Sequence, residues 1–260
     1  MNDKQKIIVS LTSFPAAIKY AVQAIRSIIN GSLLPDKIVL YLDTQKFPNG
    51  VIPSELKALK SECPIFEVKF DLAEIRSYKK LIPALRDFPE DVIVTIDDDI
   101  NYKPNTLRDL VNLHQRLPDA IIAHRVRRVI LDAPYSKWRK YKWYDFILKR
   151  HIFDFHAMQT GVGGVLYPPH SLDESMLDED LFMSMAPTND DVWFWAAAVS
   201  HGTYVVPLPN GQRTAKEVGK PKEVSLKTIN LKQGEDRNRD ALDKILAHYP
   251  AIRQKLENRK

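Results

Sequence analysis

The chain has 260 residues, of which 44% are hydrophobic and 27% are charged, an ordinary balance for a soluble globular protein of one large α/β domain. Its net charge of +5 fits an anionic ligand such as a nucleotide, a polyanion or an acidic membrane surface, without choosing among them. The single cysteine, Cys63, excludes an internal disulfide, and no apolar run forms a signal peptide or approaches the ~18 residues of a membrane span. We therefore expect a cytoplasmic protein, either free or peripheral at the inner face of the plasma membrane.

Strands and helices alternate through the first hundred or so residues. Apolar runs predict strands at 6–12, 37–43, 65–70 and 92–96. A helix is predicted after each of the first three strands, and the second and third of these helices are expected at 53–60 and 74–86. Ser13 is expected to cap the first helix, whose first turn holds Pro15 and which Gly31 ends. This alternation predicts right-handed crossovers and a largely parallel sheet.

Elements in the second half are less regular. The pattern predicts helices at 105–116 and from Thr188 or Asn189, and strands at 120–124 and 203–209. A glycine-bearing strand or turn is predicted at 159–169. From Asp236 onward, apolar residues at helical spacing predict one amphipathic helix. The stretch 207–233 has little periodicity, and we interpret it as a mobile loop over a site.

Three adjacent carboxylates, Asp97, Asp98 and Asp99, follow the fourth predicted strand. Like charges this close repel and raise one another's pKa, and a divalent cation such as Mg or Mn, which prefers oxygen ligands, is the usual way to hold them. In open α/β sheets, ligands bind beyond the carboxyl ends of the strands, where these acids are expected. The alternative is a polar turn that caps the next helix, although a cap needs only one Asp.

Five motifs occur in a fixed order along the chain: VSLTS, YLD, RSYKK, TIDDDI and, after a glycine-bearing strand, NDDVWF. In this order they resemble the GT-A glycosyltransferases, most closely the bacterial family 2-like enzymes of surface polysaccharide, capsule and lipopolysaccharide biosynthesis. The absence of G-x-G-x-x-G after the first strand counts against a dinucleotide-binding enzyme. The resemblance implies a single GT-A domain over 1–260, with a mostly parallel central sheet flanked by helices. Its parts would be a nucleotide-binding half at 1–103, an acceptor-side half at 104–233 and a C-terminal amphipathic helix at 234–260.

The resemblance implies a metal-dependent transfer of a sugar, with inversion, from a nucleotide diphosphate donor to a hydroxyl of a surface glycan or a lipid-linked acceptor. The donor is expected to be UDP-linked and the cation Mn or Mg. Asp99 and Asp97 would bind the metal, Asp97 would also contact the ribose, and Asp98 would support them. Two alternatives stay open: a nucleotidyltransferase or other metal-dependent nucleotide or phosphate enzyme, and a nucleic-acid-binding protein. Scattered basic residues and the lack of a binding motif disfavour nucleic acid as a partner.

Residues that the resemblance assigns to the donor lie at strand ends and at the start of the third helix. They are Thr12, Ser13, Phe14, Asp43, Arg76, Lys79, Lys80, Asp97 and Asp98. Thr12 and Ser13 could instead serve only as a helix cap. Arg76 and Lys80 are four residues apart, which predicts that they share a helix face, and a solvated basic face is the alternative.

A second acidic pair, Asp190 and Asp191, begins a predicted helix. By position in the family motif, Asp191 matches the base that takes the acceptor proton, and Asp190 is its partner. The motif usually has Glu before Asp, so this sequence leaves the division of roles open. Acids in a first turn also interact favourably with the helix dipole, which is the structural alternative.

Four residues are assigned to the acceptor side: His156, Gly163, Gly164 and Trp193. The glycines are expected to let the backbone approach a sugar or another strand. For His156, the alternative is a structural role. Trp193 and Trp195 are expected on opposite sides of one helix, so one would face the acceptor and the other would pack in the core. His201 and His248 match no motif and are left out of the metal site.

The segment 135–150 interleaves lysines and arginines with tryptophans, tyrosines and a phenylalanine. Such a composition is typical of a helix that lies at an anionic bilayer, which would suit a lipid-linked acceptor. The alternative is an exposed insertion that packs its aromatic rings on the domain.

Overall fold

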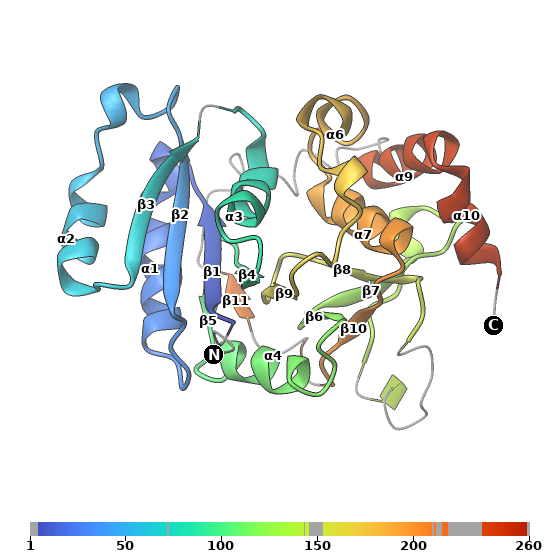
Figure 1. The fold of residues 1–260 in the computed structure, drawn as a ribbon, viewed down its shortest axis with the longest axis horizontal. Helices are drawn as coiled ribbons and strands as arrows, with labels where there is room; N and C mark the ends of the chain where they lie inside the picture. The colour runs from blue at the N-terminus through green and yellow to red at the C-terminus, as the bar shows by residue number, and fades with distance from the viewer. Residues whose placement is uncertain are drawn as a thin grey trace.

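A seven-stranded sheet in the order β10-β6-β9-β4-β1-β2-β3 forms the centre of the computed structural model of this chain (Figure 1). The structure describes residues 5–71, 73–142, 144–145, 153–209, 211, 215–217 and 236–258. The strands are β1 (Ile7–Thr12), β2 (Lys37–Asp43), β3 (Phe66–Asp71), β4 (Val92–Thr95), β6 (Ile121–Ala123), β9 (Val165–Tyr167) and β10 (Val205–Pro207). β4, β1, β2 and β3 run parallel, whereas β9 is antiparallel to both β4 and β6, and β10 is parallel to β6.

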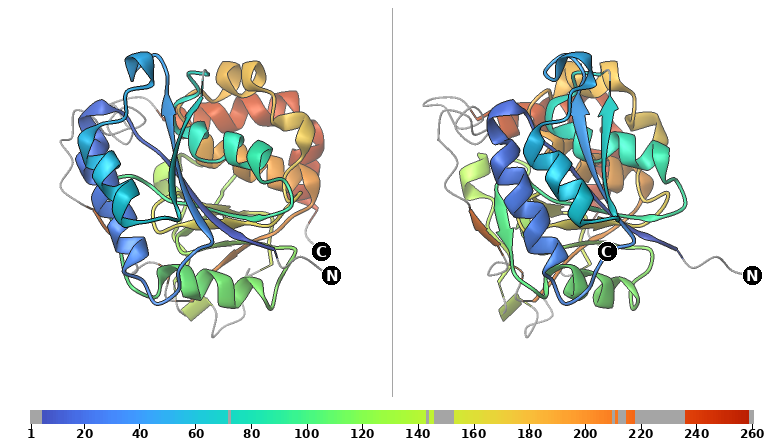
Figure 2. Two further views of the ribbon diagram at one scale, coloured as in Figure 1. Left: turned by 60° about the vertical axis from the view of Figure 1, so that its left-hand side comes forward. Right: turned by 90° about the vertical axis from the view of Figure 1, so that its left-hand side faces the viewer.

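Helices cover both faces of the sheet because successive strand residues point to opposite sides. In β1, Ile8 belongs to one hydrophobic core and Val9 to the other. The core of Val9 includes α1 (Ile18–Ile29), α2 (Ser54–Glu62) and α4 (Thr106–His114). The core of Ile8 includes α3 (Ile82–Asp87), α6 (Glu179–Met185), α7 (Asp190–His201), α9 (Arg237–His248) and α10 (Pro250–Glu257). Figure 2 shows these helices as separate layers on either side of the sheet.

Two short antiparallel pairs and five 3-10 turns complete the described part of the chain. The pairs are β5 (Ile100–Tyr102) with β11 (Ala215–Glu217), and β7 (Val126–Arg128) with β8 (Ala157–Gln159). The 3-10 turns are η1 (Pro15–Ala17), η2 (Pro48–Gly50), η3 (Arg76–Lys80), η4 (Tyr135–Lys137) and η5 (Glu174–Met176). β11 brings a segment from far along the chain to the strand that begins directly after the three acids.

The expected α/β fold with a mostly parallel sheet is confirmed, and the four strands of the first half lie where the apolar runs predicted them. The helix predicted at 74–86 is wrong, because the segment divides into η3 and α3. Pro83, in the first turn of α3, has no N–H and would clash with a preceding helical turn. The helix cap assigned to Ser13 is also wrong, since Phe14 precedes η1 and no side chain caps it.

The C-terminal amphipathic helix is two helices, α9 and α10. Pro250 occupies the first turn of α10, where its missing N–H costs nothing, but it cannot continue α9. Both helices pack with α7 in one core (Figure 1). None of the described helices has an apolar stretch long enough to cross a bilayer.

The aromatic and basic segment 135–150 does not form one continuous helix over its described residues. Tyr135–Lys137 is a 3-10 turn, and Trp138 and Tyr141 are buried in the core, which agrees with aromatic packing on the domain. Tyr144 is exposed. Positions 143 and 146–150 lie outside the described residues, as do 210, 212–214 and 218–233 of the loop predicted at 207–233.

Candidate active site

Polar side chains gather at the carboxyl ends of β1, β2 and β4, as expected for neighbouring parallel strands. Asp97, Asp98 and Asp99 follow β4, and Ser13 follows β1. The Ser13 Oγ donates a hydrogen bond of 2.6 Å to Asp98 Oδ2, and both side chains are buried. Ser13 therefore holds the middle acid of the run in place.

Lys80 joins the two acidic motifs. Its Nζ lies 3.1 Å from Asp97 Oδ1 and 2.9 Å from Asp190 Oδ2, and its side chain is only 9% exposed. Burial by itself would lower the pKa of Lys80, but Asp190, Asp97 and Asp191 outweigh it and hold the pKa well above its usual range. Lys80 is thus a permanent cation between the end of β4 and the start of α7.

The two acids at the start of α7 differ in their contacts. Both oxygens of Asp190 are engaged, Oδ1 accepting from Ser77 Oγ at 2.7 Å and Oδ2 lying against Lys80. Asp191 Oδ1 accepts one hydrogen bond of 3.0 Å from the Gly161 N–H. Although part of its surface is accessible to solvent, protein atoms surround the Asp191 carboxyl. Burial and then the charge of Asp190 raise its pKa to about 7, against the opposing effect of Lys80.

Gly161 lies directly against the charged cluster. A Cβ at this position would be 2.7 Å from Lys80 Nζ and 2.9 Å from Asp97 Oδ1, so a side chain would displace one of them. Gly163 and Gly164, the two glycines assigned to the acceptor, have φ of 103° and 93° and form the turn into β9. Positive φ angles favour glycine, which explains Gly163 and Gly164 by backbone conformation. The close approach to the charged side chains is made at Gly161 instead.

A second buried lysine, Lys79, lies beside Asp43 at the end of β2. The two side chains are 2% and 4% exposed, and Lys79 Nζ is 3.8 Å from Asp43 Oδ2. Burial lowers the pKa of Lys79, and the charge of Asp43 only partly offsets this. Among the described residues, neither Lys79 Nζ nor Asp43 Oδ2 has a hydrogen-bond partner. This buried donor and acceptor are therefore unsatisfied in hydrogen bonding, and only their ion-pair contact offsets that cost.

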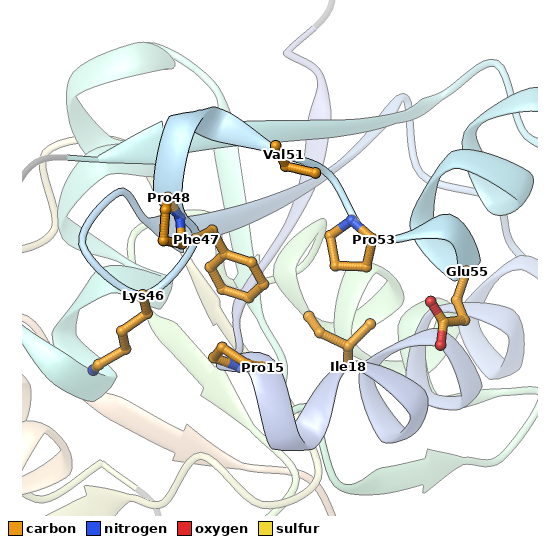
Figure 3. A pocket seen from close by; sticks show the side chains of 8 residues that line it. All are labelled: Pro15, Ile18, Lys46, Phe47, Pro48, Val51, Pro53 and Glu55. Atoms are coloured by element: carbon orange, nitrogen blue, oxygen red, sulfur yellow. The ribbon is translucent and has the colours of Figure 1, made fainter.

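A cavity of about 240 Å³ lies next to this pair, between the start of α1 and the β2–α2 connection (Figure 3). Its lining is mostly apolar and comprises Pro15, Ile18, Lys46, Phe47, Pro48, Val51, Pro53 and Glu55. Lys46 Nζ is 3.7 Å from Asp43 Oδ2, which connects the cavity to the end of β2. The cavity contains none of the clustered acids, so we locate the chemistry by the acids. The hollow is a neighbouring space of a size that suits one ring.

Three other predicted donor-side residues have different environments. Thr12 Oγ1 donates to the Tyr41 carbonyl at 2.9 Å, which ties β1 to β2. Phe14 is extended and half-buried just before η1. Arg76 is exposed with φ of 51°, while Lys80 is buried, so the prediction that these two share a helix face is wrong. A 3-10 helix has three residues per turn, which separates positions four apart.

Two predicted acceptor-side residues lie away from the acids. The Trp193 side chain is fully buried, and its Nε1 donates to the Met176 carbonyl at 2.8 Å. Trp195 is equally buried, so both tryptophans belong to the core. His156 lies between two carbonyl oxygens, with Nδ1 2.9 Å from Val129 O and Nε2 2.9 Å from Leu256 O of α10. Its position is that of a structural histidine.

Among the described residues, no group of three or more His, Cys, Asp or Glu side chains is arranged to hold a metal ion. Asp99 is nevertheless partly accessible at the end of β4, two residues from Asp97. Mg and similar cations at phosphate-binding sites use one or two carboxylates and complete their coordination with water and substrate phosphates. Asp97 and Asp99 supply oxygen atoms of the type that such an ion takes, although Lys80 already lies against Asp97 Oδ1.

Three contacts of the site come from residues that sequence reasoning did not select. Ser77 binds Asp190, the Tyr102 hydroxyl accepts a hydrogen bond of 2.8 Å from the Asp97 N–H, and Gln159 Nε2 donates to the Asp191 carbonyl at 3.3 Å. Ser77 lies inside RSYKK, and Gln159 is two residues before Gly161. Because these residues lie within or beside motifs that were already selected, their positions could have identified them from the sequence.

No protein-family model and no curated protein matches this sequence. Among solved structures, the chain is similar to the mannosyltransferase PcManGT from Pyrobaculum calidifontis, described in complex with GDP-Man and Mn²⁺. The TM-score is 0.54 at 13% sequence identity, over 98% of this chain and 73% of that chain. The two share a fold. The GT-A-like α/β class expected from the motifs is thereby confirmed.

Proposed function

We propose that this protein is a metal-dependent glycosyltransferase that moves a sugar from a nucleotide diphosphate sugar to an acceptor hydroxyl, with inversion. The observation that carries the proposal is the position of Lys80 Nζ, within 3.1 Å of both Asp97 and Asp190. This contact unites the acids at the end of β4 with the acids that begin α7. The shared fold of a mannosyltransferase supports the proposal.

Asp191 is the proposed base. Inverting transfer breaks the bond between the sugar C1 and the diphosphate oxygen while the acceptor oxygen bonds to C1, and the acceptor proton goes to the base. A carboxyl with a pKa of about 7 is well matched to that proton transfer near neutral pH. Asp190, with both oxygens engaged by Ser77 and Lys80, is a positioning residue that holds Lys80 and the start of α7.

The donor is proposed to lie across the ends of β1, β2 and β4. Lys79 Nζ and Asp43 Oδ2 lack hydrogen-bond partners among the described residues, and a donor beside an acceptor suits the edge of a nucleobase or a ribose. Negative charge grows on the diphosphate as the glycosidic bond breaks, and Lys80 is the nearest buried cation to Asp97. Asp99 and Asp97 would hold a Mn or Mg ion, which would supply further neutralisation of that charge.

UDP is the nucleotide expected from the sequence, and GDP is the alternative raised by the ligand of the mannosyltransferase. The acceptor is proposed to be a surface glycan or a lipid-linked glycan. The test is a panel of UDP-, GDP-, dTDP- and CMP-linked sugars, with the melting temperature measured with and without Mn²⁺. Selective stabilisation by one donor identifies base and sugar together, because a ligand stabilises the folded state in proportion to its affinity.

The product formed with that donor separates the proposal from nucleotidyl transfer. Release of a nucleoside diphosphate supports glycosyl transfer, whereas release of the sugar 1-phosphate would identify transfer of the nucleotidyl group. If no nucleotide sugar stabilises the protein under any metal condition, the proposed function is wrong.

A further inference from the structure

Two arginines, Arg125 and Arg127, have no carboxylate partner among the described residues. The Nε atoms of both are buried and lack a hydrogen-bond partner there. The Arg127 guanidinium lies over the Tyr135 ring, 4.6 Å from its centroid. The next arginine along the chain, Arg128, is by contrast paired with Asp154. Arg127 Nη1 donates to the Trp138 carbonyl at 2.7 Å, whereas the two buried Nε atoms are unsatisfied, which is costly. Because no carboxylate in the described part of the chain matches the charge of either guanidinium group, an anion would complete both.

The backbone at Arg125 is linked by hydrogen bonds to the residue that precedes the partner of the proposed base, Asp191. The Arg125 carbonyl accepts hydrogen bonds from both the N–H and the hydroxyl of Thr160, at 2.9 and 3.3 Å. The next residue, Gly161, donates its N–H to Asp191. Val126 is paired with Gln159, whose side chain donates to the Asp191 carbonyl. β7, which includes Arg127 and directly follows Arg125, thus pairs with β8, the strand that leads to Gly161 (Figure 1).

Arg127 in β7 and Arg125 just before it follow one alternating pattern. Val126 is buried in the core, so residues 125 and 127 point to the opposite side of the alternating pattern. Lys140 forms a bridge directly opposite Arg127, which places a second cation across from it.

The Tyr135 hydroxyl lies close enough to both arginines and to Asp191 for their charges to act on its pKa. Burial raises the pKa of its hydroxyl, Arg127 and Arg125 lower it, and Asp191 and Asp236 raise it. The arginines and the proposed base therefore act on one side chain. Asp236 is engaged in capping α9, since its oxygens accept the N–H groups of Tyr135 and Arg239.

We propose that Arg125 and Arg127 form a subsite for an anionic group, a carboxylate or a phosphate, on the acceptor. Guanidinium groups match both oxyanions through paired N–H donors, which gives orientation as well as affinity. An anion held here would present a neighbouring sugar hydroxyl to Asp191. The inference rests on the proposed function for the role of Asp191, but not for the binding of the anion.

Three small probes with one sugar ring test the subsite: methyl glucoside, methyl glucuronide and glucose 1-phosphate. Their dissociation constants are to be measured by ligand-observed NMR, with the donor site saturated by the nucleoside diphosphate that the thermal panel selects. We expect at least one anionic probe to bind roughly tenfold more tightly than the glucoside, the gain of a charge-assisted hydrogen bond. Preference for the glucuronide indicates an acidic glycan, and preference for glucose 1-phosphate indicates a phosphate next to a lipid carrier.

Arginine variants decide whether that preference belongs to the subsite. Arg125→Gln and Arg127→Gln are each expected to reduce it, and the double variant to remove it, with nucleotide affinity unchanged. Arg116→Gln, an exposed position after α4, is the control of equal charge and should keep it. Arg125→Lys and Arg127→Lys retain the positive charge without the paired N–H donors of guanidinium, so they should reduce the preference for the anionic probe only partly. These variants replace the Gln variants in the test if the latter do not fold.

Equal binding of all three probes by the unmodified protein would overturn the inference. A preference that survives the double substitution would do so too. A parallel loss of nucleotide affinity would assign the arginines to the donor. Failure of the nucleotide panel alone contradicts the proposed function but leaves the probe measurement without nucleotide as a separate test of the subsite.

Discussion

Lys79 and Lys80 are adjacent and both buried, yet their surroundings are opposite. Lys80 has two carboxylates within 3.1 Å and a raised pKa, in spite of burial. Lys79 has Asp43 at 3.8 Å and, because burial prevails, a lowered pKa. The number of close carboxylates, and not burial, decides which lysine is a fixed cation. The Lys80 centre is held by two close ion pairs, whereas the Lys79 centre has one longer ion pair and a buried donor and acceptor without hydrogen bonds.

Asp191→Asn is the largest expected change at the Lys80 centre. The amide keeps the shape of the carboxyl but cannot accept the acceptor proton, so we expect transfer to slow by roughly 10²- to 10⁴-fold. Folding and donor affinity should stay near those of the unmodified protein. Initial rates of transfer and donor dissociation constants measure the two effects separately. If Asp191→Asn transfers at the full rate while Asp190→Asn does not, the base is Asp190; if both are active, the inverting mechanism is wrong.

Lys80→Met tests the difference between the lysines directly. It leaves Asp97 and Asp190 without their cation, and removing one partner of a buried ion pair typically costs about 3–5 kcal/mol. Lys79→Met is the matched control, since it removes a more distant cation and Asp43 keeps Lys46 at 3.7 Å and the Gln45 N–H at 2.8 Å. We expect its effect on the free energy of unfolding to stay within about 1 kcal/mol. Urea denaturation measures both, and equal losses would refute the contrast.

Asp99→Ala is expected to weaken Mn²⁺-dependent donor binding while the fold survives. The loss in metal affinity should be at least roughly tenfold, the lower end of what removing even an outer partner of a metal causes. Relief of repulsion within the acidic run can slightly stabilise the metal-free protein. Calorimetric titration of Mn²⁺ in the presence of the donor measures the effect. An unchanged metal dependence would show that Asp99 is no ligand.

The pH dependence of transfer gives the smallest effect. Because Asp191 must be deprotonated to act as base, the rate should fall about tenfold per pH unit below its pKa of about 7. Between its ordinary value of 3.8 and about 7, the folded state binds more protons than the unfolded state. The free energy of unfolding should therefore decline through this group as pH rises across that window. Asp191→Asn should lose both dependences, and a variant that keeps the inflection in rate would point to another base.

Much of the first half of this fold followed from the sequence. Buried strands are continuous apolar runs, so β1, β2, β3 and β4 were predicted to within a residue or two. The three acids after β4 were selected as functional by residue type and position, and the pair before VWFW by its place in the motif of the resembling family. Errors came where proline limited a helix, as at Pro83 and Pro250, since helical spacing of apolar residues persists across such a break.

Only the tertiary structure decided which residues meet. Asp97 and Asp190 are 93 positions apart in numbering, and their connection through Lys80 depends on β4, η3 and α7 converging at one edge of the sheet. The clash that makes Gly161 necessary involves atoms of two other segments, so local sequence could not distinguish it from Gly163. Trp193 and His156 likewise turned out to have core and carbonyl partners on distant elements. Sequence patterns record what each segment buries, whereas contacts between segments depend on how the layers pack.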